Sequence, residues 1–184
     1  FSRYFYPQLN KEGLIIDDRA NGGGNVSPMI LERLSREPYR LTMRRGSARI
    51  GTVPDAVQVG PKVCLINKYS ASDGDLFPWG FRALGLGKLI GTRTWGGIVG
   101  ISGSLPYMDG TDIRVPFFTS FDPKTGSWII ENHGVDPDIL IDNDPVKEWN
   151  GEDQQLDRAI QEVMKELQDR KPLPGVPTPR DFSK

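Results

Sequence analysis

The chain has 184 residues, a length that fits one domain or two small ones. Its 23 basic and 24 acidic residues nearly cancel, so the charge balance indicates neither a polyanion nor a membrane surface as a partner. A hydrophobic content of 37%, together with 21 glycines and 15 prolines, favours a loop-rich α/β protein over a helical bundle.

The N-terminal part of the chain predicts a strand, a helix and two further strands. The sequence begins at Phe1, and FSRYFYPQL is typical of the middle of an amphipathic element, so we expect a fragment of a longer polypeptide. Residues 13–18 predict a buried strand, and residues 26–37 predict a helix with Ser27 as its N-cap. Two short strands joined near RRGS are expected within residues 39–52.

The middle of the chain predicts a second strand–helix–strand unit. Residues 62–67 form an apolar run that predicts a buried strand, and Cys64 within it is expected to be a buried thiol. A helix is expected from about Ser72 to Leu84, because glycines follow that cannot easily continue it. Residues 88–92 predict the next strand.

The C-terminal part predicts further strands, one helix and a tail. Residues 104–130 predict strands with turns at MDGTD and DPKTG. A helix is expected from Asp153 to about Gln168, and residues 169–184 predict a proline-rich extended tail. The apolar face of that helix is expected to contain Leu156, Ala159, Ile160, Val163, Met164 and Leu167. Strands that alternate with helices indicate a sheet whose strand C-termini carry the site.

Two loops combine a preceding strand, small polar residues and a following helix. They are DDRANGGGN after the first strand and NKYSASDGD after the strand at 62–67. Backbone N–H groups at such corners are free to bind an anion. A serine there would be a nucleophile beside an oxyanion hole, and Gly22, Gly23 and Gly24 would let the backbone approach a substrate carbonyl group.

A purely structural interpretation competes with this one. Three glycines after a strand are a common turn, and their spacing fits neither a dinucleotide motif nor a P-loop. Ser72 is a good helix N-cap, and Asp73 and Asp75 suit the positive end of the helix dipole. Spacing alone favours the cap. Among Asp17, Asp18 and Arg19, the arginine is expected to pair with a nearby acid and to stiffen the loop that carries Gly24, and no His, Cys or carboxylate cluster has the spacing of a metal site.

Three segments change this balance because together they resemble a known family. LIIDDRANGGGNVS, NKYSASDGDLFPWGFRALGLGKLIGTRTWGGIVGI and ENHGVDPDI resemble the C-terminal catalytic domain of the tricorn proteases, within the carboxy-terminal processing peptidases. The resemblance implies a serine endopeptidase with a ClpP/crotonase-like α/β fold of stacked β-β-α units. It also implies that residues 1–168 are the catalytic domain and that no cofactor or metal is needed.

The resemblance implies a role for particular residues. Ser72, and not Ser70, corresponds to the nucleophile that precedes Asp-Gly-Asp. The N–H groups of Asp73 and Gly24 correspond to the oxyanion hole, and Glu131 to the carboxylate that supports the catalytic base. The implied substrate-binding residues are Gly22, Gly23, Gly96, Gly97, Ile98, Val99, Gly100 and Ile101, of which those from 96 onward resemble an edge that pairs with the substrate backbone.

The catalytic base is the part of the resemblance that this sequence lacks. The lysine of the carboxy-terminal processing branch corresponds to Gly97, and Lys88 begins a strand on the wrong side of GTRTW. The tricorn branch supplies a histidine from an upstream segment, so we expect upstream domains to carry the base. His133 is the one histidine, and a hydrogen-bonded surface histidine is the favoured interpretation of it.

The resemblance also implies partners and a location. The expected substrates are peptides or unfolded polypeptides, and the expected assembly is a homo-oligomer, with neither nucleic acid nor membrane as a partner. A cytoplasmic location is implied, while an envelope or secreted location stays open. The alternative function is that of a non-catalytic peptide- or ligand-binding member of the same fold, which would have no reason to keep both the Ser-Asp-Gly corner and Glu131.

Overall fold

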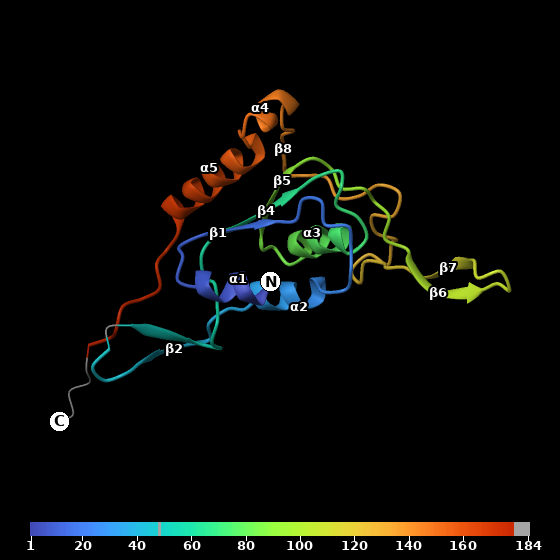
Figure 1. Cartoon of the computed structure of the whole chain (residues 1–184). Coiled ribbons are helices and arrows are strands. Elements are labelled where there is room, and N and C mark those ends of the chain that lie inside the picture. The colour runs from blue at the N-terminus through green and yellow to red at the C-terminus, as the bar shows by residue number, and fades with distance from the viewer. Residues whose placement is uncertain (48, 179–184) are drawn as a thin grey trace.

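The computed structural model describes residues 1–47 and 49–178 and centres on a parallel sheet (Figure 1). Its four strands run in the order β1-β4-β5-β8, and they span Leu14–Asp17 (β1), Lys62–Ile66 (β4), Gly87–Gly91 (β5) and Ile139–Leu140 (β8). Neighbouring strands are parallel throughout, so their carboxyl ends meet at one edge of the sheet.

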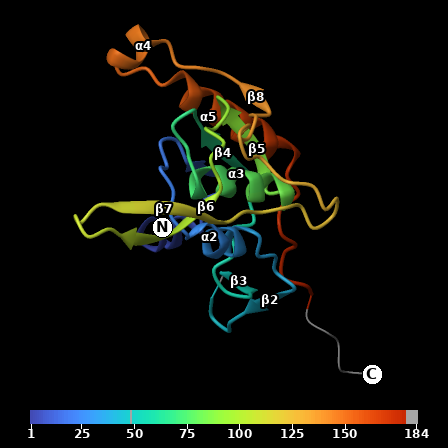
Figure 2. The ribbon, with the colours of Figure 1, turned by 90° about the vertical axis from the view of Figure 1, so that its right-hand side faces the viewer.

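Helices cover both faces of this sheet (Figures 1 and 2). One face packs on α1 (Ser2–Phe5), α2 (Ser27–Leu34) and α3 (Asp73–Ala83), and the other packs on α5 (Gln154–Asp169). The strand β4 has apolar side chains on both faces of the sheet, and helices on both sides are needed to bury them. Its side chains alternate, so that Cys64 and Ile66 are buried beside α3 while Val63 and Leu65 are buried beside α5.

Two antiparallel hairpins and three shorter pieces complete the chain. The hairpins pair β2 (Arg40–Met43) with β3 (Ile50–Val53), and β6 (Gly100–Pro106) with β7 (Asp112–Phe118). The β6–β7 hairpin extends away from the sheet in both views (Figures 1 and 2). The shorter pieces are η1 (Tyr6–Gln8), α4 (Pro145–Trp149) and residues 170–178, which follow α5 without helix or strand. In the described residues, no helix is both long and apolar enough to cross a bilayer.

Most predicted elements are confirmed, but the start of α2 was predicted wrongly. Val26, and not Ser27, is the N-cap, and its side chain makes no cap hydrogen bond. The carboxylate of Asp73 replaces the cap, because it accepts the N–H groups of Val26 at 2.9 Å and of Ser27 at 3.0 Å. The capping role that the local sequence pattern predicts for Ser27 is thus filled by an acceptor 46 residues away in the sequence. The helix also ends earlier than expected, at Leu34.

Two predictions for the second half also need correction. Within residues 119–130 the predicted strand pairing is reduced to a single bridge between Phe121 and Trp128. On α5, Leu156, Ile160 and Met164 are exposed, whereas Ala159 and Val163 pack on the sheet. The apolar stripe of α5 is therefore wider than the face that its own sheet covers.

Candidate active site

The two predicted loops are in contact at the carboxyl edge of the sheet. One follows β1 and the other follows its neighbour β4, so parallel pairing places them side by side. The N–H of Ala71 donates to the carbonyl oxygen of Asn21 at 2.8 Å, and the Ser70 hydroxyl donates to the carbonyl oxygen of Asp18 at 2.8 Å. A Cβ on Gly74 would lie 2.1 Å from the Asn21 carbonyl oxygen, so only glycine permits this approach.

Ser72 occupies a sharp turn between the loop after β4 and the helix α3. Its φ of 58° and ψ of −115° are unusual for a residue with a side chain. It is the N-cap residue of α3, and the carboxylate of Asp75 accepts the Ser72 N–H at 2.8 Å, whereas the Ser72 hydroxyl makes no cap hydrogen bond. The predicted cap is therefore confirmed. The N–H of Asp75 bonds to the Ser72 carbonyl oxygen at 2.9 Å, so the cap is formed largely by groups other than the hydroxyl.

The glycine loop lies directly against Ser72. A Cβ on Gly23 would lie 2.8 Å from the Ser72 Cβ and 3.2 Å from its hydroxyl oxygen. Gly23 and Gly24 have φ values of 115° and 150°, which favour glycine, and a Cβ on Gly24 would be 4.0 Å from the Asp73 carboxylate. Nothing lies within 4 Å of a Cβ on Gly22. The predicted nucleophile and the predicted glycine loop are thus neighbours in space.

Asp73 connects the serine turn to the helix that follows the glycine loop. Its buried carboxylate accepts the N–H groups of Val26 and Ser27 and the hydroxyl of Ser27. The glycine loop is consequently attached at both ends to residues that flank Ser72, through Asn21 at its start and through Val26 and Ser27 at its end.

Asp75 connects Ser72 to the segment that follows β5. Its Oδ1 accepts the N–H of Gly96 at 2.8 Å, and its Oδ2 accepts the N–H of Gly97 at 3.2 Å as well as that of Ser72. The side chain is fully buried. Sequence analysis interpreted Asp73 and Asp75 as partners of the helix dipole, and the structure shows that both also hold distant backbone groups in place.

Glu131 holds the next two residues of the same segment. Its Oε2 accepts the N–H groups of Ile98 at 2.6 Å and Val99 at 3.0 Å, while the N–H of Asn132 donates to the Gly96 carbonyl oxygen at 2.7 Å. The carboxylates of Asp75 and Glu131 therefore fix the backbone of residues 96–99, and that of Asp75 also accepts the N–H of Ser72. The segment continues into β6 through Gly100 and through Ile101, whose side chain is exposed.

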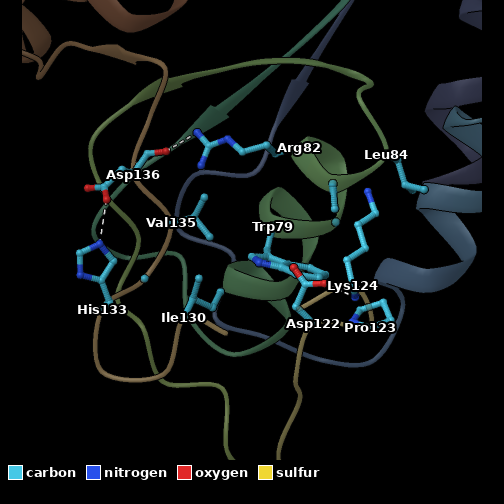
Figure 3. Close-up of a pocket in the computed structure, with 13 residues that line it drawn as sticks. Trp79, Arg82, Leu84, Asp122, Pro123, Lys124, Ile130, His133, Val135 and Asp136 are labelled. Atoms are coloured by element: carbon cyan, nitrogen blue, oxygen red, sulfur yellow. Dashed lines mark hydrogen bonds and ion pairs between the residues drawn. The ribbon is translucent and has the colours of Figure 1, made fainter. Parts of the chain in front are cut away.

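The two candidate bases within the chain have other partners. Lys88 pairs with Glu162 of α5 and so turns to the face of the sheet opposite to α3, which Ser72 begins. His133 is exposed and its Nε2 lies 2.7 Å from a carboxylate oxygen of Asp136 (Figure 3). These contacts agree with the favoured interpretation of His133 as a hydrogen-bonded surface residue.

A depression beside α3 is a different place from the serine turn. It has a volume of about 690 Å³ and contains His133, Trp79 and Lys124 in its wall (Figure 3). Arg82 at its rim donates to the carbonyl oxygen of Asp136. Ser72 is not among the described residues that line it.

The two acids at the end of β1, Asp17 and Asp18, have different environments. Arg19 forms the expected ion pairs, with Asp17 at 2.7 Å and with Asp153 at 2.8 Å, and its hydrogen bond lowers the pKa of Asp153 to about 2. Asp18 is only 7% exposed, and burial is the main reason that its pKa rises to about 7. Its Oδ2 has no hydrogen-bond partner among the described residues. Nothing in the sequence distinguishes Asp18 from Asp17, because both are aspartates at the end of the same apolar run.

The raised pKa of Asp18 predicts a pH-dependent free energy of unfolding. Because its folded pKa of about 7 exceeds the ordinary 3.8, its contribution to stability is complete below pH 3.8 and is lost as pH rises through 7. We expect wild-type protein to lose about 3 kcal/mol between pH 5 and 8.5 relative to Asp18→Asn. Urea unfolding at both pH values measures this loss. Asp55→Asn, at an exposed acid, is the control, and equal pH dependence in all three proteins would contradict the prediction.

In residues 1–47 and 49–178, no three His, Cys, Asp or Glu side chains are grouped in a way that could hold a metal ion. The buried Cys64 is a further group without a visible chemical role. Burial raises the pKa of its thiol, as predicted for a thiol inside an apolar strand. Ser72, its backbone neighbours and the carboxylates of Asp75 and Glu131 are the polar groups that the structure brings together at this edge of the sheet.

Comparisons with known proteins agree on one family. The sequence pattern of peptidase family S41 matches residues 4–141. The tricorn protease of Thermoplasma volcanium is 42% identical over 171 residues, which are 91% of this chain and 16% of the relative. Tricorn protease homolog 1 of Streptomyces coelicolor is 39% identical over 153 residues, which are 83% of this chain and 14% of the relative.

A solved structure confirms the expected fold class. The crystal structure of the tricorn protease matches with a TM-score of 0.82 and 40% identity, and the match covers 91% of this chain and 16% of that one. A protein structure from Parabacteroides merdae, 24% identical with a TM-score of 0.62 over 83% of this chain and 52% of that one, shows the same fold. The chain thus spans about a sixth of the length of the tricorn relatives that it matches.

Proposed function

This chain belongs to peptidase family S41, and on that premise we propose that it carries the nucleophile of a tricorn-type serine endopeptidase that cleaves peptides or unfolded polypeptides. The observation that carries the proposal is the contact between Gly23 and Ser72. It puts a glycine loop, whose Gly24 N–H we propose as an oxyanion donor, beside a hydroxyl on a helix N-terminus, which is the arrangement that acyl transfer requires.

In the proposed reaction, the Ser72 oxygen attacks the scissile carbonyl carbon and loses its proton to a histidine from an upstream segment of the polypeptide. The N–H groups of Gly24 and Asp73 donate to the oxyanion that forms. Expulsion of the amine, which takes the proton from the histidine, leaves an acyl-enzyme, and water then releases the acid. Each oxyanion donor is worth about 3 kcal/mol of transition-state stabilisation.

The fixed segment 96–99 supports a binding role for the edge that follows it. Asp75 and Glu131 already accept the four N–H groups of this segment. The Gly96 carbonyl oxygen is also engaged, by the N–H of Asn132. We therefore assign substrate pairing to the carbonyl groups of residues 97–99 and to Gly100 and Ile101, where β6 begins as one strand of a two-stranded sheet. An added strand binds through backbone groups and demands no particular side chain.

Glu131 is proposed to support the base with the carboxylate oxygen that the segment does not use. Its hydrogen bonds to Ile98 and Val99 both go to Oε2, which leaves Oε1 to accept from a group that orients the histidine. We further propose that residues 1–168 are the catalytic unit and that 169–184 form a tail. Assembly into a homo-oligomer and a cytoplasmic location are proposed from the resemblance to the tricorn proteases.

Reaction with a fluorophosphonate probe tests this function. In the full polypeptide that contains this chain, we expect labelling at Ser72, identified by peptide mass mapping, and none in Ser72→Ala. The 184-residue chain alone should react at least about 100-fold more slowly, because a serine without a base stays a weak neutral nucleophile. Labelling absent from the full polypeptide would favour the alternative, a non-catalytic member of the fold that binds peptides or other ligands.

A further inference from the structure

Asn21 joins the glycine loop to a buried carboxyl group. Its side-chain Nδ2 donates to the Asp18 Oδ1 at 2.8 Å, and its Oδ1 accepts the N–H of Gly23 at 3.1 Å. Its carbonyl oxygen accepts the N–H of Ala71, next to Ser72. One residue therefore touches the carboxyl group, the glycine loop and the serine turn.

Asp18 sits at the wall of a small cavity with acids around it. The cavity has a volume of about 160 Å³, enough for a few water molecules at about 30 Å³ each, and Asn21 and Asp73 also line it. The titratable groups that face Asp18 are Asp17 on β1, Asp73 and Asp75 on α3, and the buried thiol of Cys64 on β4. On the side of α1 and α2, the cavity wall consists of Phe1, Val26, Ser27 and Ile30, which carry no titratable side chains.

We propose that Asp18 is a proton-linked positioning residue, which acts through Asn21 to set the position of the glycine loop beside Ser72. The inference deepens the function proposed above and rests on it, because the loop matters for catalysis only if Gly24 donates to an oxyanion. Three observations carry it: the unpartnered Oδ2, the relay through the Asn21 amide, and the cavity into which water can enter.

The physical reason is the cost of a buried charge. Protonated Asp18 is neutral and keeps Asn21 in a fixed orientation through its Oδ1. Ionisation puts a negative charge on a carboxylate that three other acids surround, so the group gains by drawing water from the cavity toward its Oδ2. Because the same amide bonds both Asp18 and Gly23, a shift of the carboxylate moves the loop. With the pKa of Asp18 at about 7, both forms are populated near neutral pH.

Amide NMR of the 184-residue chain tests the relay without using activity. We expect the Gly23 amide resonance to titrate between pH 5 and 9 with a midpoint near 7, and this titration to vanish in Asp18→Asn. Asp55→Asn, at an exposed acid, should leave it unchanged. In Asn21→Ala, Asp18 should still titrate, seen at its own carboxyl carbon, while Gly23 no longer follows. The last variant keeps the test valid if Asp18→Asn fails to fold.

Activity of the full polypeptide provides the second measurement. We expect an alkaline fall in kcat, with KM changing less than twofold, that Asp18→Asn removes. A Gly23 amide that does not titrate, or that titrates equally in Asp18→Asn or in Asn21→Ala, would overturn the proposal. Fluorophosphonate labelling at Ser72 is measured separately. If the proposed function is wrong, Ser72 is not labelled. If the relay is wrong, the Gly23 amide resonance does not titrate, or its titration does not depend on Asp18 and Asn21.

Discussion

Replacing Asp75 with asparagine is expected to lower kcat/KM of the full polypeptide about 10²- to 10³-fold, mainly through kcat. The carboxylate accepts three N–H groups, from Ser72, Gly96 and Gly97, and asparagine offers one acceptor oxygen while turning an amide N–H₂ toward the remaining donors. Each hydrogen bond to a charged group is worth about 1.5–3 kcal/mol, so a loss of 3–4 kcal/mol in transition-state positioning corresponds to that factor.

The matched control for Asp75 is Asp157→Asn on α5. Asp157 is also an acid in the first turn of a helix, but it is exposed. If Asp75 acted mainly through the helix dipole, the two substitutions would have similar effects on stability, at most about 1 kcal/mol each. Steady-state kinetics and urea unfolding on both variants separate the two explanations. An Asp75→Asn enzyme with more than a third of wild-type kcat would show that the carboxylate does not position Ser72.

Replacing Gly23 with alanine is expected to reduce kcat at least about 100-fold, equivalent to about 2.7 kcal/mol of transition-state stabilisation. The new Cβ would lie 2.8 Å from the Ser72 Cβ, a distance that forces either the loop or the serine to move. Movement of the loop also carries Gly24 away from its proposed place as an oxyanion donor.

In Gly23→Ala, the backbone strain of an alanine at positive φ must be distinguished from the collision of its Cβ with Ser72. Gly126→Ala serves this purpose, because Gly126 has a φ of 68° and nothing within 4 Å of a Cβ. That variant should lose about 1–2 kcal/mol of stability and keep its kcat. Comparison of kcat for the two variants, each at a temperature well below its own unfolding, isolates the collision. Equal kcat in Gly23→Ala and Gly126→Ala would contradict the placement of Gly23 against Ser72.

The two loops of the candidate site were predictable because the signals for them are local. Apolar runs ended by polar residues predicted β1 and β4, and the parallel pairing of these two strands brings their carboxyl ends together. Ser72 could be placed at a helix start from its following acids alone. Its proposed role as a nucleophile could not be inferred in the same way, because capping and catalysis use the same residue type at the same position.

The parts that sequence analysis missed depend on contacts between distant residues. Asp75 reaches Gly96 across 21 residues, and Glu131 reaches Ile98 across 33, with no periodic pattern to reveal either contact. The same cause explains the wrong N-cap of α2, since Asp73 supplies from afar an acceptor that Ser27 was expected to supply locally. Asp18 was overlooked because burial and the absence of a partner are properties of the fold and not of its residue type.

The attachment of the glycine loop at both of its ends has a consequence for engineering. Asn21 fastens one end to Ala71, and Asp73 fastens the other through Val26 and Ser27. The first attachment joins backbone atoms, whereas the second requires a carboxylate at position 73, so a chimera that receives residues 67–75 from a relative keeps both only if that position stays acidic. Transplanting residues 18–27 and 67–75 together should preserve the contacts between the two loops. For the same reason, the substitutions that each loop accepts during evolution should be limited by the need to keep its contacts with the other.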